Sequence, residues 1–224
     1  MSAPLIELRG VSFGYGPGHP VLRDLSFELQ PGERVVLTGS NGSGKTTLLH
    51  AIMGLAIPQS GEVEVFGEVR RREPDFHAVR REVGLLFQDS DDQLFCPTVF
   101  EDVAFGPLNL GMRPQAVEEV VARTLAMLGL TGYEDRITYK LSYGEKKMVA
   151  LATILAMEPR ILLLDEPTAG LDETHEGRLT AILQDLPQEM IVVSHNRIFL
   201  EQVATRIAHL KEGRVTEEDR VPES

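Results

Sequence analysis

Two patterns of apolar residues occur along the chain and predict strands in two environments. Apolar and polar positions alternate in Leu25–Leu29 and in Val63–Val65, which is typical of strands that bury one face. The runs Val35–Leu37, Ile161–Leu164 and Met190–Ser194 are almost continuously apolar, which favours strands buried on both faces. The chain is therefore expected to hold half-buried strands near its N-terminus and fully buried strands at three further places.

Helices are predicted between these strands. Residues 45–53 are mostly helix formers, and Pro114 and Gly129 are placed to begin and end a second helix, with apolar residues at helical spacing between them. A third helix is expected over residues 144–157, ahead of Pro159, and another after the last buried strand. Buried strands that are separated by helices predict an α/β fold, in which a parallel sheet is covered on both sides.

The helix-rich segment 88–158 interrupts this α/β pattern. We expect it to form a helical lobe inserted into a single domain of residues 1–224. The α/β core would then comprise residues 1–87 and 159–224 and carry an antiparallel β subdomain at its N-terminus. The polar end of the chain, Glu217–Ser224, is expected to be frayed.

Composition and charge narrow the possible environments. The 224 residues are 42% hydrophobic and 25% charged, with a net charge of −12, as in a soluble globular protein. This acidic balance argues against a nucleic-acid partner, which requires a basic face. A single cysteine, Cys96, excludes an internal disulfide and fits a reducing cytosol. Residues 149–157, the longest nearly apolar stretch, reach about half the length needed to cross a bilayer, so a membrane location at the cytoplasmic face would depend on another chain.

A glycine-rich segment between a predicted strand and a predicted helix carries the first functional signal. Gly39–Thr46 matches the pattern G-x-x-x-x-G-K-[ST], in which main-chain N–H groups and a helix N-terminus surround phosphate oxygens. Lys45 is placed to reach the terminal phosphates and the Thr46 hydroxyl to bind Mg²⁺. The predicted nucleotide-binding residues here are Gly39, Ser40, Asn41, Gly42, Ser43, Gly44, Lys45, Thr46 and Thr47.

Two adjacent carboxylates end the buried strand at Ile161–Leu164. Asp165 is predicted to bind Mg²⁺ through water, and Glu166 to polarise an attacking water molecule. Ligands of parallel sheets bind at the carboxyl ends of the strands, where both residues are expected to lie. Mg²⁺ makes two carboxylates next to a triphosphate tolerable.

With both motifs in place, the chain resembles, over essentially its whole length, the ATP-binding subunit of ATP-binding cassette (ABC) transporters. The resemblance implies a P-loop (RecA-like) fold, ATP and Mg²⁺ as ligands, and Mg²⁺-dependent ATPase activity. It implies that Tyr15 stacks on adenine, with Phe13 as an alternative. It also implies that Gln88 contacts Mg²⁺ and the attacking water, that His195 contacts the γ-phosphate, and that the loop ending at Asp172 addresses a second subunit.

The segment Leu141–Glu145 resembles the family's Leu-Ser-Gly-Gly-Gln signature, with Tyr143 and Glu145 as departures. In the family, the serine and glycine, here Ser142 and Gly144, face the γ-phosphate held by the other subunit. Ser-x-x-Glu before an apolar run is also a capping box, so Ser142 and Glu145 are expected to begin a helix in either case. The other histidines, His19, His50, His77, His175 and His209, are expected to be structural or surface residues.

Further residues resemble the energy-coupling factor type of importer, and within it cobalt and nickel uptake systems. The resemblance rests on Glu145–Lys147, on Phe87–Phe95 and on Glu101–Gly111, with Ser90 and Met148 as departures. It implies a head-to-tail dimer, with an identical or closely related partner, that encloses two ATP molecules and acts on integral membrane subunits.

The Asp89–Phe105 region would contact those subunits. Its acidic residues Asp89, Asp91 and Asp92 would face either basic residues of the partner or solvent. Three alternatives stay open on sequence alone. They are a soluble cassette ATPase that acts on DNA or the ribosome, a regulatory module that binds nucleotide without hydrolysis, and a transporter for a vitamin or another small solute.

Overall fold

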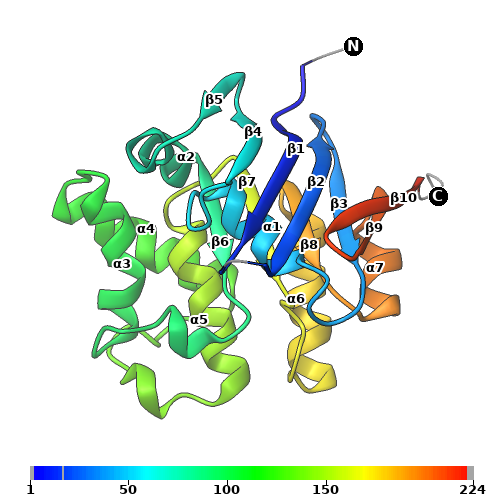
Figure 1. Ribbon diagram of the computed structural model, residues 1–224. Helices are drawn as coiled ribbons and strands as arrows, with labels where there is room; N and C mark the ends of the chain where they lie inside the picture. The colour runs from blue at the N-terminus through cyan, green and yellow to red at the C-terminus, as the bar shows by residue number, and fades with distance from the viewer. Residues whose placement is uncertain (1–2, 17, 221–224) are drawn as a thin grey trace.

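The computed structural model describes residues 3–16 and 18–220, which form two β-sheets with helices packed around them (Figure 1). The strands are β1 (Ile6–Gly14), β2 (Pro20–Leu29), β3 (Arg34–Thr38), β4 (Ser60–Val65), β5 (Glu68–Arg70), β6 (Val83–Leu86), β7 (Ile161–Asp165), β8 (Glu189–Val193), β9 (Arg206–Lys211) and β10 (Arg214–Arg220). The α-helices are α1 (Lys45–Ile52), α2 (Phe76–Glu82), α3 (Val99–Asn109), α4 (Pro114–Met127), α5 (Tyr143–Leu155), α6 (Glu173–Asp185) and α7 (Arg197–Val203). Short 3-10 helices cover Glu73–Asp75, Ser90–Asp92 and Thr138–Lys140.

The larger sheet has the strand order β10-β9-β3-β8-β7-β6. Strands β6, β7, β8, β3 and β9 are parallel to one another, and β10 pairs with β9 in the antiparallel direction. The three predicted buried runs are β3, β7 and β8, so the predicted parallel sheet is confirmed. The carboxyl ends of β3, β7 and β8 lie at one edge of this sheet, where ligands of parallel sheets bind.

The smaller sheet, with the order β2-β1-β4-β5, is antiparallel throughout. Leu25, Phe27 and Leu29 on β2 are buried and alternate with exposed residues, as the period-two pattern predicts. One apolar cluster joins these side chains to Leu48 and Leu49 of α1 and to one face of the larger sheet. Helix α1 is thereby fixed between the two sheets.

Helices α3, α4 and α5 follow one another between β6 and β7 and lie beside the sheets on the left of Figure 1. A second apolar cluster joins them to the opposite face of the larger sheet. Along β7, Ile161 and Leu163 belong to the first cluster, whereas Leu162 and Leu164 belong to the second. This strand is continuously apolar because each of its faces packs against a separate layer.

Helix ends follow the sequence signals closely. Helix α4 begins at Pro114, and Gly129, just beyond its end, has a φ of 58°, the left-handed geometry of a helix C-terminus. Helix α5 begins at Tyr143, one residue before the predicted start, because Ser142 caps it. The expectation of a frayed chain end is wrong for residues 217–220, because their main chain pairs with β9 as part of β10; residues 221–224 lie outside the described part of the chain.

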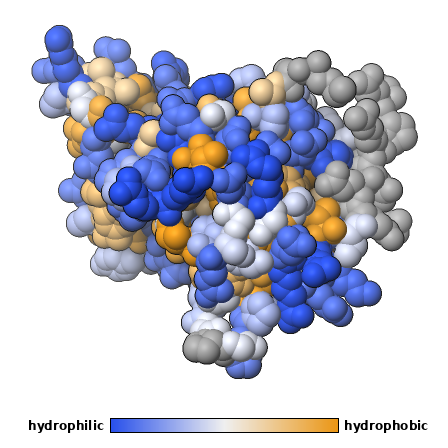
Figure 2. Space-filling view, turned by 45° about the horizontal axis from the view of Figure 1, so that its top comes forward, coloured by the Kyte–Doolittle hydropathy of each residue, from blue (hydrophilic) through white to orange (hydrophobic). Residues whose placement is uncertain are grey.

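Hydrophilic residues cover most of the face shown in Figure 2, and apolar residues form separate patches among them. Over residues 3–16 and 18–220, none of the helices combines the length and the apolar content that crossing a bilayer requires.

Candidate functional site

The glycine-rich loop connects the end of β3 to the start of α1. Gly39 has a φ of 147° and Gly44 a φ of 109°, values that residues with a side chain rarely adopt. A Cβ on Gly39 would lie 2.1 Å from the main-chain oxygen of Leu210 on β9, so no other residue fits there. The loop therefore has the backbone conformation that the phosphate-binding pattern predicts. The N-terminus of α1 faces the space that the loop surrounds, where a phosphate would bind.

Lys45, the first residue of α1, folds back over the loop. Its Nζ donates hydrogen bonds to the carbonyl oxygens of Gly39, at 2.8 Å, and Ser40, at 3.1 Å. Burial lowers the pKa of the Lys45 ammonium, and the carboxylates of Glu166 and Asp165 oppose this shift. A phosphate bound beside the ammonium would stabilise its charge further.

Thr46 and Asp165 form the part of the site that suits a magnesium ion. The Thr46 hydroxyl donates to Asp165 Oδ2 at 2.7 Å. Asp165 is buried at the end of β7, and its Oδ1 has no hydrogen-bond partner among the described residues. A buried carboxylate oxygen without a partner is costly, and Mg²⁺ prefers oxygen ligands and needs only one or two from the protein beside phosphate and water. These residues therefore fit the ion.

Glu166 continues from β7 in an unusual backbone conformation, with a φ of 46°. Its main-chain N–H donates to the carbonyl oxygen of Val193 on β8 at 2.9 Å, and its Oε1 lies 3.4 Å from His195 Nε2. Burial raises the pKa of the Glu166 carboxyl, whereas His195 acts in the opposite direction. The strained turn thus places a carboxylate and an imidazole together beside the phosphate loop.

One cavity of about 440 Å³ gathers most of the predicted nucleotide-binding residues. Its lining comprises Tyr15, Val21, Asn41, Gly42, Gly44, Lys45, Thr46, Thr47, Gln88, Asp165, Glu166 and Val193. Tyr15 is 70% exposed at the rim, and its hydroxyl lies 3.3 Å from Thr47 Oγ1. Phe13 packs edge-on against Tyr15 but does not line the cavity, so of the two predicted stacking residues only Tyr15 borders it.

The predicted capping box at the start of α5 is present. Ser142 Oγ accepts a hydrogen bond from Glu145 N, and Glu145 Oε2 accepts one from Ser142 N at 2.8 Å. Glu145 Oε1 accepts further bonds from the Tyr133 hydroxyl at 2.7 Å and from Arg136 at 3.0 Å. These partners lower the pKa of Glu145. The negative charge that replaces the family's usual glutamine is therefore paired within the helical lobe.

Gly144 lies against the first turn of α6. A Cβ at this position would meet the His175 ring at 2.8 Å, so glycine is needed here for close packing. His175 N and Nδ1 lie 2.9 and 2.8 Å from the carboxylate of Asp172, which caps α6. The only signal in the sequence for this role of His175 is its position three residues after Asp172. Tyr143 packs beside Gly170 in the loop that precedes α6, where a Cβ would meet its ring at 2.9 Å.

Several predicted nucleotide contacts do not line the nucleotide cavity. Gly39, Ser40 and Ser43 belong to the loop around it and His195 lies beside Glu166, whereas three others come from different elements. Ser142, Gly144 and Asp172, all described by the structure, do not line the nucleotide cavity of their own chain. Ser142 and Asp172 are exposed. The start of α5 is therefore free to face a ligand held by another molecule.

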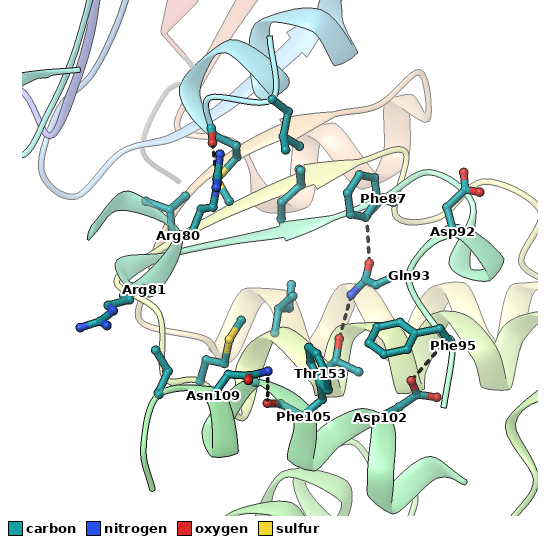
Figure 3. Close-up of a pocket in the computed structure, with 18 residues that line it drawn as sticks. Arg80, Arg81, Phe87, Asp92, Gln93, Phe95, Asp102, Phe105, Asn109 and Thr153 are labelled. Atoms are coloured by element: carbon teal, nitrogen blue, oxygen red, sulfur yellow. Dashed lines mark hydrogen bonds between the residues drawn. The ribbon is translucent and has the colours of Figure 1, made fainter. Parts of the chain in front are cut away.

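The structure also contains a groove that sequence analysis did not identify as a cavity. It has a volume of about 610 Å³ and lies between β6 and the helices α3 and α5 (Figure 3). Phe95 and Phe105 contact each other edge to face, with ring centroids 4.9 Å apart, and are 67% and 48% exposed. Asp102 is buried beneath them and accepts hydrogen bonds from the main-chain N–H groups of Phe95 and Cys96.

The acidic residues next to this groove have separate partners. Asp91 pairs with Lys146 of α5 at 2.6 Å, and Asp89 Oδ1 accepts a hydrogen bond from Asp91 N. Asp92 is exposed and lines the groove. Two of the three carboxylates in the acidic run are thus engaged within the chain.

Comparisons with known proteins agree with this geometry. Residues 22–169 match the ABC transporter family. An energy-coupling factor transporter ATP-binding protein, EcfA, of Methanothermobacter thermautotrophicus is 47% identical over 96% of this chain and 70% of its own. Other curated relatives, 41–50% identical, are described as putative ABC transporter ATP-binding proteins.

Solved structures extend the likeness to the whole fold. The structure of cbiO1 from Clostridium perfringens, described as part of the ABC transporter complex cbiONQ, is 30% identical with a TM-score of 0.87, over 98% of this chain and 89% of that one. The ATP-binding cassette MJ0796, in a dimeric post-hydrolysis state with ADP and Pi, is 26% identical with a TM-score of 0.89, over 98% of this chain and all of that one. The chain therefore belongs to the ABC transporter family, as an ATP-binding and ATP-hydrolysing subunit.

Proposed function

We propose that this subunit powers an importer of the energy-coupling factor type, with cobalt or nickel ions as cargo. Two copies, or one copy and a close relative, would enclose two Mg²⁺-bound ATP molecules head to tail at the cytoplasmic face of the membrane. Closure of the dimer would act on integral membrane subunits that hold the transport path. Each step is supported by a separate part of the chain.

The observation that carries the proposal is the division of each nucleotide site. The phosphate loop, Asp165 and Glu166 lie around one cavity, whereas Ser142 lies outside it at an exposed helix start. A helix N-terminus suits an anion, and a two-fold dimer repeats every contact on both sides. Two head-to-tail chains would thus complete two sites at once.

Within each site, different residues of the chain bind the nucleotide and promote its hydrolysis. The main chain of the glycine-rich loop and Lys45 hold the phosphates, while Tyr15 covers the base. Glu166 accepts a proton from the attacking water, and His195, 3.4 Å away, faces the γ-phosphate. Thr46, Asp165 and Gln88 would hold Mg²⁺, which would supply positive charge that neutralises the phosphates.

The groove beside α3 and α5 would receive the membrane subunit. Exposed apolar side chains line it, among them Leu55, Phe95, Phe105 and Leu110, and clusters of this kind mark interaction sites. Arg80 and Arg81 lie at the end opposite Asp92 (Figure 3). The occupant that fits is a short amphipathic helix, with an apolar face toward the phenylalanines and charged residues at both ends.

Two observations support the type of importer. The chain is 47% identical to a protein described as EcfA, and the stretches around Phe87–Phe95 and Glu145–Lys147 resemble cobalt and nickel systems. Cargo contacts would lie in a membrane subunit, so the cargo must be tested in the assembled complex.

Purification of this chain from membranes, followed by uptake assays with labelled Ni²⁺ and Co²⁺, tests the proposal. We expect integral membrane proteins to co-purify and metal uptake to depend on ATP. Uptake of a vitamin in place of metal would retain the importer and change its cargo. Co-purification with nucleic acid that is lost at high salt would instead indicate a soluble ATPase. If the chain shows no Mg²⁺-dependent ATP hydrolysis, it would instead be a regulatory module that binds nucleotide without hydrolysing it.

A further inference from the structure

Lys147 is a fully buried lysine of α5 that no step above uses. Its side chain is 0% exposed, and its Nζ donates to the main-chain oxygens of Gln88 at 2.6 Å and Phe87 at 3.4 Å. Among the described residues, no carboxylate lies within ion-pair distance of this ammonium. The centroid of the Tyr143 ring lies 5.9 Å from Nζ, and carboxylates beyond ion-pair distance also favour the charge, but burial still lowers the pKa of the Lys147 ammonium. The charge is therefore costly to bury, and stability alone does not explain a lysine here.

Gln93 also connects the loop that begins at Phe87 to α5, at a point nearer the C-terminal end of this helix. Its Oε1 accepts a hydrogen bond from Phe87 N at 3.1 Å, and its Nε2 donates to Ala150 O and to Thr153 Oγ1, both at 2.8 Å. Figure 3 shows Gln93 in the groove between Phe87, at the end of β6, and Thr153 on α5. The side chain therefore uses both its acceptor and its donor groups to join a strand end to a helix.

These contacts lie on one face of α5. Lys147, Ala150 and Thr153 follow one another at intervals of three residues, which places them along one side of a helix. The loop from Phe87 to Gln93 is consequently held at two points, one near the nucleotide cavity and one inside the groove.

We propose that Lys147 is a positioning residue, which fixes Gln88 onto α5 so that the loop from Phe87 to Gln93 and the start of α5 move as one body. The inference deepens the proposed function and rests on its dimer. Gln88 belongs to the chain's own nucleotide site, whereas Ser142, at the start of α5, faces the partner's ATP. A clamp between them couples the two sites, and Gln93 extends this coupling to the groove.

Steady-state ATPase kinetics of the full chain test the clamp. Lys147→Met removes the donor with a side chain that suits a buried position. We expect kcat to fall about tenfold, as when an outer partner of a catalytic group is removed, while the KM for ATP changes less than twofold. Lys147→Gln, similar in length to methionine but with an N–H donor, should recover part of kcat. Lys146→Met, which breaks an outer ion pair to Asp91, is the neighbouring control and should leave kcat nearly unchanged.

A double-mutant cycle with Gln88→Ala separates positioning from simple support of the fold. If Lys147 acts through Gln88, Lys147→Met has little further effect on kcat in the Gln88→Ala background. Additive losses, a kcat that Lys147→Met leaves unchanged, or equal losses in the Met and Gln variants would each overturn the inference. Wild-type turnover measured in the same series checks the ATPase activity itself separately, because it does not depend on the Lys147 variants.

Discussion

The nucleotide cavity and the groove are built from opposite kinds of surface. The nucleotide cavity is lined by main-chain atoms and charged groups and holds a buried carboxylate oxygen without a partner. The groove is lined mainly by apolar side chains, and two of its polar residues, Asp102 and Gln93, are already bonded within the chain. Unsatisfied polar atoms select a small charged ligand, whereas exposed apolar area selects a protein surface.

The nucleotide cavity and the groove also differ in which segments of the chain supply their residues. Most of the nucleotide cavity comes from one loop–helix segment, Gly39–Thr47, and from the end of β7. The groove takes residues from α2, β6, α3, α5 and the segment that follows α1, far apart in the sequence. Local sequence motifs are therefore enough to identify the nucleotide cavity, whereas the groove can be identified only from the packed structure. The following variants test whether each region has a separate function.

Glu166→Gln should produce the largest effect and act on the nucleotide cavity alone. The amide keeps the shape of the side chain but cannot accept the proton, so we expect hydrolysis to fall by about 100-fold or more. ATP binding should persist, and the variant should elute as a nucleotide-bound dimer in gel filtration. Hydrolysis near the wild-type rate would remove Glu166 from the role of base.

Phe95→Asp should act on the groove alone. Loss of an exposed aromatic residue at an interface centre costs about tenfold or more in binding, so transport by the assembled complex should fall by that factor. The ATPase activity of the isolated subunit should stay within twofold of wild type. Met127→Asp, at an exposed apolar position outside the groove lining, is the matched control. Equal loss in both assays would mean that Phe95 supports the fold.

Gly144→Ala tests the junction of α5 with the first turn of α6. The added Cβ would meet the His175 ring at 2.8 Å, so we expect a loss of about 1–3 kcal/mol in the free energy of unfolding. Gly177→Ala, where a Cβ meets nothing, should stabilise α6 by about 0.5–1 kcal/mol. Urea denaturation measures both, and the double variant Gly144→Ala/His175→Ala should recover part of the loss. A Gly144→Ala variant as stable as wild type contradicts the packing argument.

Glu145→Gln should give the smallest effect, one that depends on pH. Hydrogen bonds from Ser142, Tyr133 and Arg136 depress the pKa of Glu145 in the folded chain, so the carboxylate stabilises the fold above its ordinary pKa. We expect the substitution to cost about 1 kcal/mol at pH 7. The difference should shrink as the pH falls through the depressed value, because both forms are then uncharged.

Denaturation curves at neutral and acidic pH check this dependence. Glu158→Gln, at an exposed glutamate paired with Arg123, is the control and should change stability little at either pH. A cost for Glu145→Gln that does not vary with pH would show that its charge is not what stabilises the start of α5.

The sequence predicted more of the strands and of the phosphate site than of the helical lobe. Strands β3, β7 and β8 were visible as apolar runs, because burial on both faces leaves no polar position. The sequence predicts a helix-rich segment over residues 88–158 but no separate helix at α3, which contains Pro107, a residue type that normally ends a helix. The capping box of Thr98 and Glu101 was the available signal for its start.

Roles that depend on distant partners could not be predicted. The sequence did not show that Arg136 and Tyr133 would pair with Glu145, nor that Lys147 would be buried against the main chain of Gln88. His175 is expected to be a structural or surface residue, but the sequence does not show that it packs against Gly144 beside a capping aspartate.

By itself, the sequence determined the chemistry of the phosphate loop and the order of buried strands and helices. Both follow from residues close together in the chain, whose backbone needs and hydrophobic period are local properties. Only the tertiary structure decided that Ser142 lies outside its own nucleotide cavity, that a groove opens beside α5, and that Lys147 joins Gln88 to this helix. These features depend on the packing of a helical lobe against a sheet, and such packing is fixed by many distant contacts at once.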